Sequence, residues 1–128
     1  MRAEHVALQV EDPKAMAAWW GEHLGWKVVR DGGGATQMCF IADESGEVLI
    51  ELYRHPNLPV PDYRTQSPLV LHIAFAVEDM EAEHTRLTAA GATEAEPKTK
   101  TASGDYLWMH RDPWGVSIQL CQRVEKLR

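Results

Sequence analysis

The chain has 128 residues, of which 45% are hydrophobic and 25% charged, and its formal net charge is −6. This length suits one compact domain, and the balanced composition excludes disordered, fibrous and coiled-coil classes. The acidic balance argues against nucleic acid and anionic membrane surfaces as partners, and no apolar run reaches the ~20 residues of a membrane span. We therefore expect a small molecule as the main partner.

Two structural units of the same kind are predicted in chain order. Residues 4–10 alternate as in a strand, a helix begins after Asp12 and ends at Gly25, and strands follow at about 26–31, 36–42 and 47–53. A Pro-rich linker covers about 55–68. The second unit repeats the order with a strand at 69–77, a helix after Asp79, and strands at about 93–98, 105–111 and 116–122.

Each unit therefore reads β-α-β-β-β. We expect a single domain, 1–128, made of a first module at about 1–54, the linker, and a second module at about 69–123. The glycine run at 32–34 is expected to form the hairpin turn between two strands of the first module.

An internal repeat supports this division. Residues 5–12 are answered by residues 72–79, with identical residues at five of the eight positions. Residues 50–52 are echoed by 118–120. The two copies thus stay in register over a whole module.

In each of four predicted strands, one face carries a single side chain able to bind a metal, and its neighbours on that face are mostly small residues. Strand alternation puts the aliphatic residues on the opposite face, which we expect the helices to cover. The ligand-type residues are His5, Glu51, His72 and Gln119. A lone strand histidine is more often structural, but these four fall in matching positions of the two copies. Two imidazoles, one carboxylate and one amide oxygen suit one divalent ion such as Zn²⁺, Ni²⁺, Co²⁺, Fe²⁺ or Mn²⁺.

Further residues on the same face are candidates for contacts with a substrate. The alternative for each is that it lines the face without a specific role. They are Gln9, Tyr53, Ser117 and Cys121, with Trp108 as a possible apolar wall or core residue. The remaining histidines are expected to be structural or solvated, with His55 and His110 as the candidates nearest a rim. Both cysteines are expected to be reduced thiols, and the N-terminus does not resemble a signal peptide, which favours a cytoplasmic protein.

The closing segment 112–120, Asp-Pro-Trp-Gly-Val-Ser-Ile-Gln-Leu, resembles the Asp-Pro-x-Gly-x-x-Ile-Glu-Leu signature of the vicinal oxygen chelate superfamily. This superfamily contains glyoxalases, bleomycin-resistance proteins and extradiol dioxygenases, and the chain is most similar to bacterial glyoxalase I in length and ligand order. The resemblance implies an α+β fold in which two βαβββ modules form a cup-shaped mixed sheet with helices on its outer face. It also implies a divalent metal on the four positions above and a homodimer, with the site within one chain or across two.

Three positions depart from glyoxalase I. Gln119 stands where a glutamate is usual, Gln9 occupies the neighbourhood of a glutathione-binding arginine, and the Arg54-His55 region replaces an asparagine. The resemblance therefore does not extend to glutathione recognition.

The resemblance implies a metal-dependent glyoxalase-like lyase or isomerase. Its substrate would be a small 2-oxo or 2-hydroxycarbonyl compound or a thiol adduct, converted through an enediolate-type intermediate, with Glu51 as metal ligand and base. One alternative is a metal-free, ligand-sequestering protein of the bleomycin-resistance kind. A weaker alternative is an extradiol-type dioxygenase, which would need an iron triad from His5, His72 and Glu51.

Overall fold

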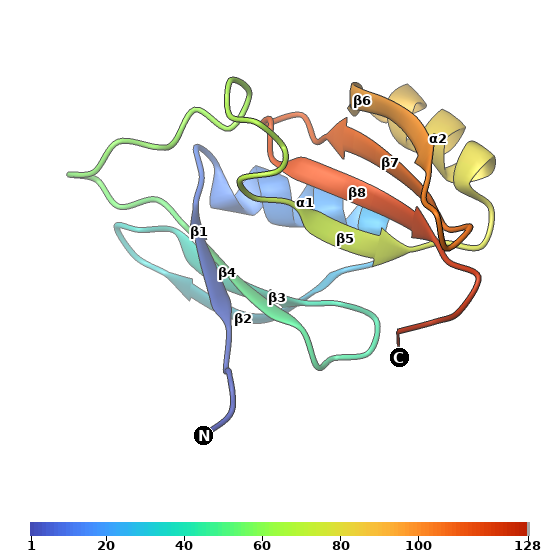
Figure 1. Ribbon diagram of the computed structural model, residues 1–128. Coiled ribbons are helices and arrows are strands. Elements are labelled where there is room, and N and C mark those ends of the chain that lie inside the picture. Colours follow the sequence, from blue (N-terminus) through green and yellow to red (C-terminus); the bar gives the residue numbers. More distant parts are fainter. Residues whose placement is uncertain (128) are drawn as a thin grey trace. The chain divides into compact units, whose positions relative to one another are not determined.

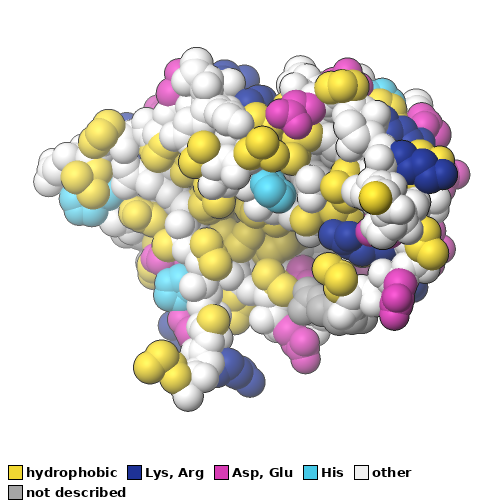
Figure 2. All heavy atoms as spheres, in the orientation of Figure 1, with side chains coloured by type: hydrophobic (Ala, Val, Ile, Leu, Met, Phe, Trp, Pro, Cys, Tyr) yellow, Lys and Arg dark blue, Asp and Glu magenta, His cyan; other side chains and the backbone are white. Residues whose placement is uncertain are grey.

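The computed structural model describes residues 1–127, which divide into two compact units, one of residues 1–61 and one that begins at Asp62. Each unit is described by itself. Neither of the two described helices is long and apolar enough to cross a membrane. On the face seen in Figure 2, Lys and Arg side chains are interspersed with Asp and Glu side chains.

The first unit contains one helix and a four-stranded sheet (Figure 1). Its elements are β1 (Val6–Gln9), α1 (Pro13–Leu24), β2 (Lys27–Gly33), β3 (Met38–Ala42) and β4 (Leu49–Tyr53). The strand order is β1-β4-β3-β2, with β1 parallel to β4 and the other pairs antiparallel. The two edge strands are therefore β1 and β2.

The local sequence explains where α1 begins and ends. The Asp12 side chain accepts a hydrogen bond from the Ala15 amide at 2.9 Å, and Gly25 ends the helix with a φ of 74°. The buried face of α1 includes Met16 and Trp20, and the helix contacts β2, β3 and β4. This face covers the aliphatic side of the sheet, so the polar outliers of the strands lie on the other side.

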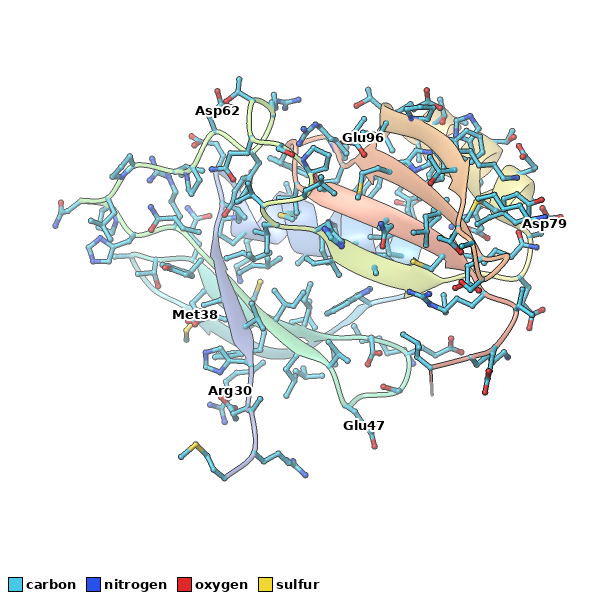
Figure 3. All side chains as sticks on the ribbon, viewed as in Figure 1. Arg30, Met38, Glu47, Asp62, Asp79 and Glu96 are labelled. Carbon is cyan, nitrogen blue, oxygen red and sulfur yellow. The ribbon has the colours of Figure 1, made fainter. Side chains whose placement is uncertain are left out.

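The second unit repeats the connectivity. Its elements are β5 (Ile73–Ala76), α2 (Met80–Ala89), β6 (Thr93–Lys100), β7 (Tyr106–Arg111) and β8 (Ser117–Gln122), in the sheet order β5-β8-β7-β6. Asp79, labelled in Figure 3, caps α2 by accepting a hydrogen bond from the Ala82 amide at 3.0 Å. The predicted α+β class with two βαβββ modules is confirmed.

Some predicted boundaries shift for reasons visible in the pairing. β1 starts at Val6 and β5 at Ile73 because pairing begins only there, with Ile50 and Ile118 as partners. The prediction that residues 32–34 form the hairpin turn was wrong in part: β2 extends through Gly33, which pairs with Met38. The connection to β3 consists of residues 34–37.

Candidate functional site

The first half-site consists of His5 and Glu51. Glu51 lies in β4 opposite Ala7 of β1, so His5, two residues before Ala7, projects from the same face of the parallel pair. His5 Nε2 lies 3.3 Å from Glu51 Oε2, and the two side chains are 30% and 19% exposed. The first predicted histidine and carboxylate are therefore brought together, in a position open to a small ligand.

Two neighbours orient the His5 ring. The Glu4 carboxylate contacts Nδ1, and the Phe40 ring packs edge-on against the imidazole with centroids 5.2 Å apart. The hydrogen bond that Glu4 accepts from the His5 ring raises the pKa of His5, burial opposes the shift, and the charges of Glu4 and Glu51 add to it. Phe40 was not predicted; its place on this face follows from its pairing with Glu51 in β3 and β4.

The second half-site consists of His72 and Gln119. Gln119 lies in β8 opposite Ala74 of β5, so His72, two residues before Ala74, takes the position that His5 has in the first unit. His72 Nδ1 lies 2.9 Å from the Pro68 carbonyl oxygen. Both His72 and Gln119 are half-buried. The repeat seen in the sequence thus becomes a repeat of backbone register.

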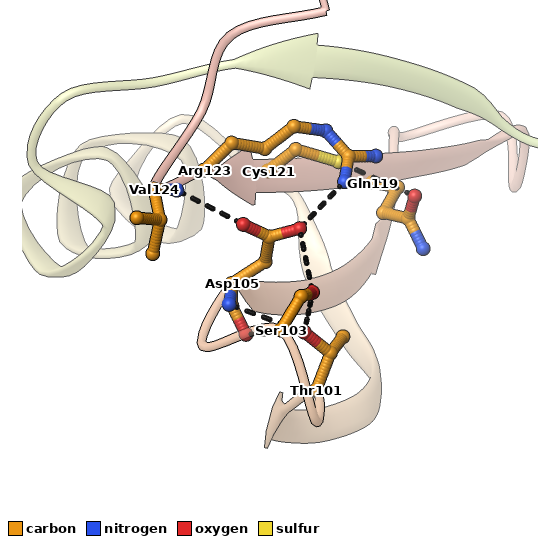
Figure 4. A network of polar contacts seen from close by, with 7 residues as sticks. All are labelled: Thr101, Ser103, Asp105, Gln119, Cys121, Arg123 and Val124. Carbon is orange, nitrogen blue, oxygen red and sulfur yellow. Dashed lines mark hydrogen bonds and ion pairs between the residues drawn. The ribbon is translucent and has the colours of Figure 1, made fainter.

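Gln119 is oriented by its neighbour Cys121 (Figure 4). Cys121 Sγ donates to Gln119 Oε1 at 3.3 Å, and burial raises the pKa of the Cys121 thiol, which keeps the donor proton in place. The end of β8 is anchored by Asp105, whose carboxylate accepts from the Val124 amide and Arg123 Nη1, both at 2.9 Å. These contacts hold Gln119 on a rigid strand.

The donor set fits a divalent ion. In each half-site the histidine Nδ1 is hydrogen-bonded to an oxygen, which leaves Nε2 as the nitrogen for a metal. An oxygen donor on the adjacent parallel strand accompanies each histidine. No cluster of three or more His, Cys, Asp and Glu side chains suited to a metal lies within residues 1–127, and the four predicted ligands are divided two and two between the units.

Two of the predicted pocket residues bond to the protein itself. Gln9 Nε2 donates to the carbonyls of Leu58 and Pro59 at 3.1 and 2.6 Å, so this side chain fastens the loop after β4. Ser117 Oγ accepts from Arg111 at 3.1 Å. Tyr53 pairs with Gln9 on the face of the first half-site.

Trp108 lies on the opposite face from Gln119, so of the two places predicted for it the structure gives the core and not the pocket wall. It pairs with Leu120, stacks on His84 of α2 with ring centroids 3.9 Å apart, and donates from Nε1 to Glu94 at 2.8 Å. The helix-covered face carries this tryptophan because an aromatic ring in a small fold is more often core than pocket wall.

His110 also lies under α2 and not at a rim. It is fully buried, and its Nε2 lies 2.8 Å from His84 Nδ1. Burial lowers the pKa of His110, and the neighbouring His84 lowers it further. His110 therefore belongs to the interior of the second unit, on the far side of the sheet from Gln119.

The comparisons with known proteins agree with this architecture. Residues 5–121 match the family described as a glyoxalase-like domain. A glyoxalase family protein from Bacillus cereus is 23% identical, with 98% of this chain and 95% of that one aligned and a TM-score of 0.76.

Two further solved structures are similar. A glyoxalase/bleomycin resistance protein/dioxygenase domain from Frankia sp. is 25% identical, with 95% and 97% of the two chains aligned and a TM-score of 0.70. A glyoxalase I variant from Zea mays is 21% identical over 97% of this chain and 46% of that one, with a TM-score of 0.73. A search of curated proteins finds no significant match.

Proposed function

The chain belongs to the glyoxalase-like domain family, and from this premise we propose that it is a divalent-metal-dependent lyase or isomerase. Its substrate is a small compound with adjacent oxygens, a 2-oxo or 2-hydroxycarbonyl compound or the thiol adduct of one. His5, Glu51, His72 and Gln119 hold the metal, and Glu51 also serves as the base.

One observation carries this proposal. Each unit presents a histidine whose Nδ1 is already bound to an oxygen, beside an oxygen donor on the neighbouring parallel strand. Metal-ligating histidines almost always have the other ring nitrogen bound to a partner that fixes the ring, and both of these histidines have one. The arrangement therefore supports a four-ligand site made of two equivalent halves.

The metal and the side chains around it have separate roles in the proposed reaction. When bound, the metal supplies Lewis acidity toward the oxygens of the substrate. Glu51, the one carboxylate of the four, takes the proton from the carbon next to the carbonyl, and His5 Nε2 lies 3.3 Å from it. Phe40 shields the His5 ring on one side.

Gln119 sets the charge of the site. With one carboxylate and a doubly charged ion the formal charge is +1, whereas a second carboxylate would bring it to zero. We propose that the ion is a stronger electrophile but is held less tightly than in a site with two carboxylates.

The test is metal uptake by the purified full chain after loading with Zn²⁺, Ni²⁺, Co²⁺, Fe²⁺ or Mn²⁺. Elemental analysis should find about one ion per chain, lost in His72→Ala. The matched control is His23→Ala, on α1, whose side chain is 22% exposed. Equal uptake by the two variants would contradict the ligand assignment.

The absence of uptake by the wild-type chain under every loading condition would contradict the metal-dependent activity. The alternative is then a ligand-sequestering protein of the bleomycin-resistance kind, for which binding of cationic aromatic compounds is the measurement. The homodimer and the cytoplasmic location stay proposals of the same kind, and sedimentation analysis tests the first of them.

A further inference from the structure

Segment 63–68, which precedes β5, is bound to the turn between β7 and β8. Arg111 Nη1 donates to the Tyr63 carbonyl at 2.6 Å, and Nη2 donates to the Gln66 carbonyl at 2.7 Å. Arg64 Nη2 also contacts the Pro113 carbonyl. Because a guanidinium presents its donors in a rigid fork, Arg111 holds this short segment at two points, Tyr63 and Gln66, at once.

Arg111 is itself held in place. Its Nη1 group also donates to the Gly115 carbonyl and to Ser117 Oγ, each at 3.1 Å. Its four hydrogen bonds thus go to three main-chain carbonyls and one hydroxyl. The cation is used to bind backbone and not to pair with a carboxylate.

Gly115 brings the segment close to this turn. Its φ is +95°, and a Cβ built on it would lie 2.9 Å from the backbone nitrogen of Arg64. A side chain at this position cannot be accommodated without moving the segment, because the atom it meets is backbone. The turn and the segment therefore behave as one packed piece.

The same segment ends at Pro68, whose carbonyl contacts His72 Nδ1 at 2.9 Å. A carbonyl oxygen is an acceptor only, so this contact requires the proton on Nδ1 and leaves the lone pair on Nε2. Pro68 is buried, which keeps water from competing for its carbonyl. The ring of His72 is thus oriented by the segment before β5, and not by a side chain of the sheet.

We propose that Arg111 is a positioning residue for His72: it fixes segment 63–68, whose Pro68 carbonyl selects the Nδ1–H tautomer and presents Nε2 to the metal. This inference rests on the proposed function in taking His72 as a ligand. Arg111 would thus affect metal binding through the backbone of segment 63–68, without contacting the ion itself.

The test has two readouts on the full chain. Nitrogen-15 NMR of the metal-free protein at neutral to alkaline pH reports the tautomer of His72, assigned by the signal missing in His72→Gln. Titration with Zn²⁺ against a chromophoric chelator reports the affinity. Arg111→Ala should mix the two tautomers of His72 and weaken Zn²⁺ binding about 10- to 100-fold, as loss of an orienting partner does at other sites.

Gly115→Ala disturbs the segment by a second route and should act in the same direction. Its matched control is Gly46→Ala, at a φ of +74°, where the new Cβ meets no atom within 4 Å. The control for Arg111→Ala is Arg86→Ala, an arginine of α2 whose side chain is 46% exposed. Both controls should keep the tautomer and the affinity of the wild type.

The outcomes separate this inference from the proposed function. A tautomer mixed in Arg111→Ala but fixed in the wild type supports the positioning role even if the wild type binds no Zn²⁺, a result that overturns only the metal site. Retention of the Nδ1–H tautomer in both Arg111→Ala and Gly115→Ala overturns the positioning role. If Arg111→Ala does not fold, Arg111→Lys replaces it, because a single ammonium cannot reproduce the two-ended fork and should show a partial effect.

Discussion

The two half-sites have the same backbone register but different chemistry. His5 is oriented by an exposed carboxylate, that of Glu4, and faces a second carboxylate in Glu51. His72 is oriented by a buried main-chain carbonyl and accompanied by the neutral amide of Gln119. In the proposed metal site, the one carboxylate would therefore come from the first unit and the neutral amide from the second.

The largest effect on activity is expected from replacing Glu51, the only carboxylate among the four proposed ligands. Glu51→Gln keeps the size and an oxygen donor but loses the charge and the base, so turnover of any α-carbonyl substrate found by screening should fall about 10²- to 10⁴-fold. Steady-state kinetics measures it. Gln119→Ala, in the neutral half-site, should mainly weaken metal binding; an equal loss of turnover at saturating metal in both variants would remove the distinction between the halves.

A second test gives both half-sites a carboxylate. Gln119→Glu adds the carboxylate that the first half-site already has, and it should tighten metal binding about tenfold or more. Competition titration measures the change, with Gln122→Glu at the end of the same strand as the control. Weaker binding by Gln119→Glu would show that position 119 does not face the ion.

The helix-covered face of the second unit contains a buried histidine, His110, and this predicts an effect of pH on stability. His110 is buried against His84, near Glu94 and the ring of Trp108, with Lys98 Nζ 5.8 Å from that ring. Burial holds the pKa of His110 below its usual 6.5, so below about that pH the unfolded chain binds a proton that the folded chain does not.

The stability that neutral His110 contributes is therefore present above pH 6.5 and is lost as the pH falls from there through the lower folded pKa. Thermal unfolding between about pH 8 and pH 5 should show this loss, and His110→Phe should flatten the profile. His23→Phe, at a half-buried position of α1, is the control. A profile unchanged in His110→Phe would assign the acid sensitivity to other groups.

The smallest effect is expected at Cys121. Its thiol is a weak donor to Gln119 Oε1, so Cys121→Ala should reduce metal affinity only a few-fold, less than about tenfold. The matched control is Cys39→Ala, a buried thiol on the helix-covered side of the first unit, where Sγ contacts the Pro13 carbonyl at 3.7 Å. A loss in Cys121→Ala as large as that in His72→Ala would make the thiol a ligand itself.

Much of the fold was predictable because local signals agree with the tertiary structure. Asp12 and Asp79 mark the starts of both helices, and strand alternation correctly separates Glu51 from the aliphatic face. The hairpin after β2 was placed too early because Gly33, although a turn former, pairs in the ladder with Met38. At Gly33, pairing between the strands outweighs the tendency of glycine to form turns.

The candidate site was predictable to the level of residue type and face. The match of residues 5–12 with 72–79 identifies equivalent histidines, and register then places each beside an oxygen donor. The orienting partners were not predictable. Pro68 contributes a main-chain carbonyl, which carries no sequence signal, and the place of Trp108 stayed open because a single tryptophan fits a pocket wall as well as a core.

The amino-acid sequence by itself determined the repeat, the βαβββ order of each unit and the four ligand-type side chains, since periodicity and capping act over a few residues. Only the tertiary structure decided which partner orients each histidine ring. Arg111 and Gly115 contact segment 63–68 from more than forty residues away in the chain, and Pro68, the last residue of that segment, contacts His72 locally. Such long-range hydrogen bonds depend on how the turn between β7 and β8 packs against the segment before β5, which no local pattern encodes.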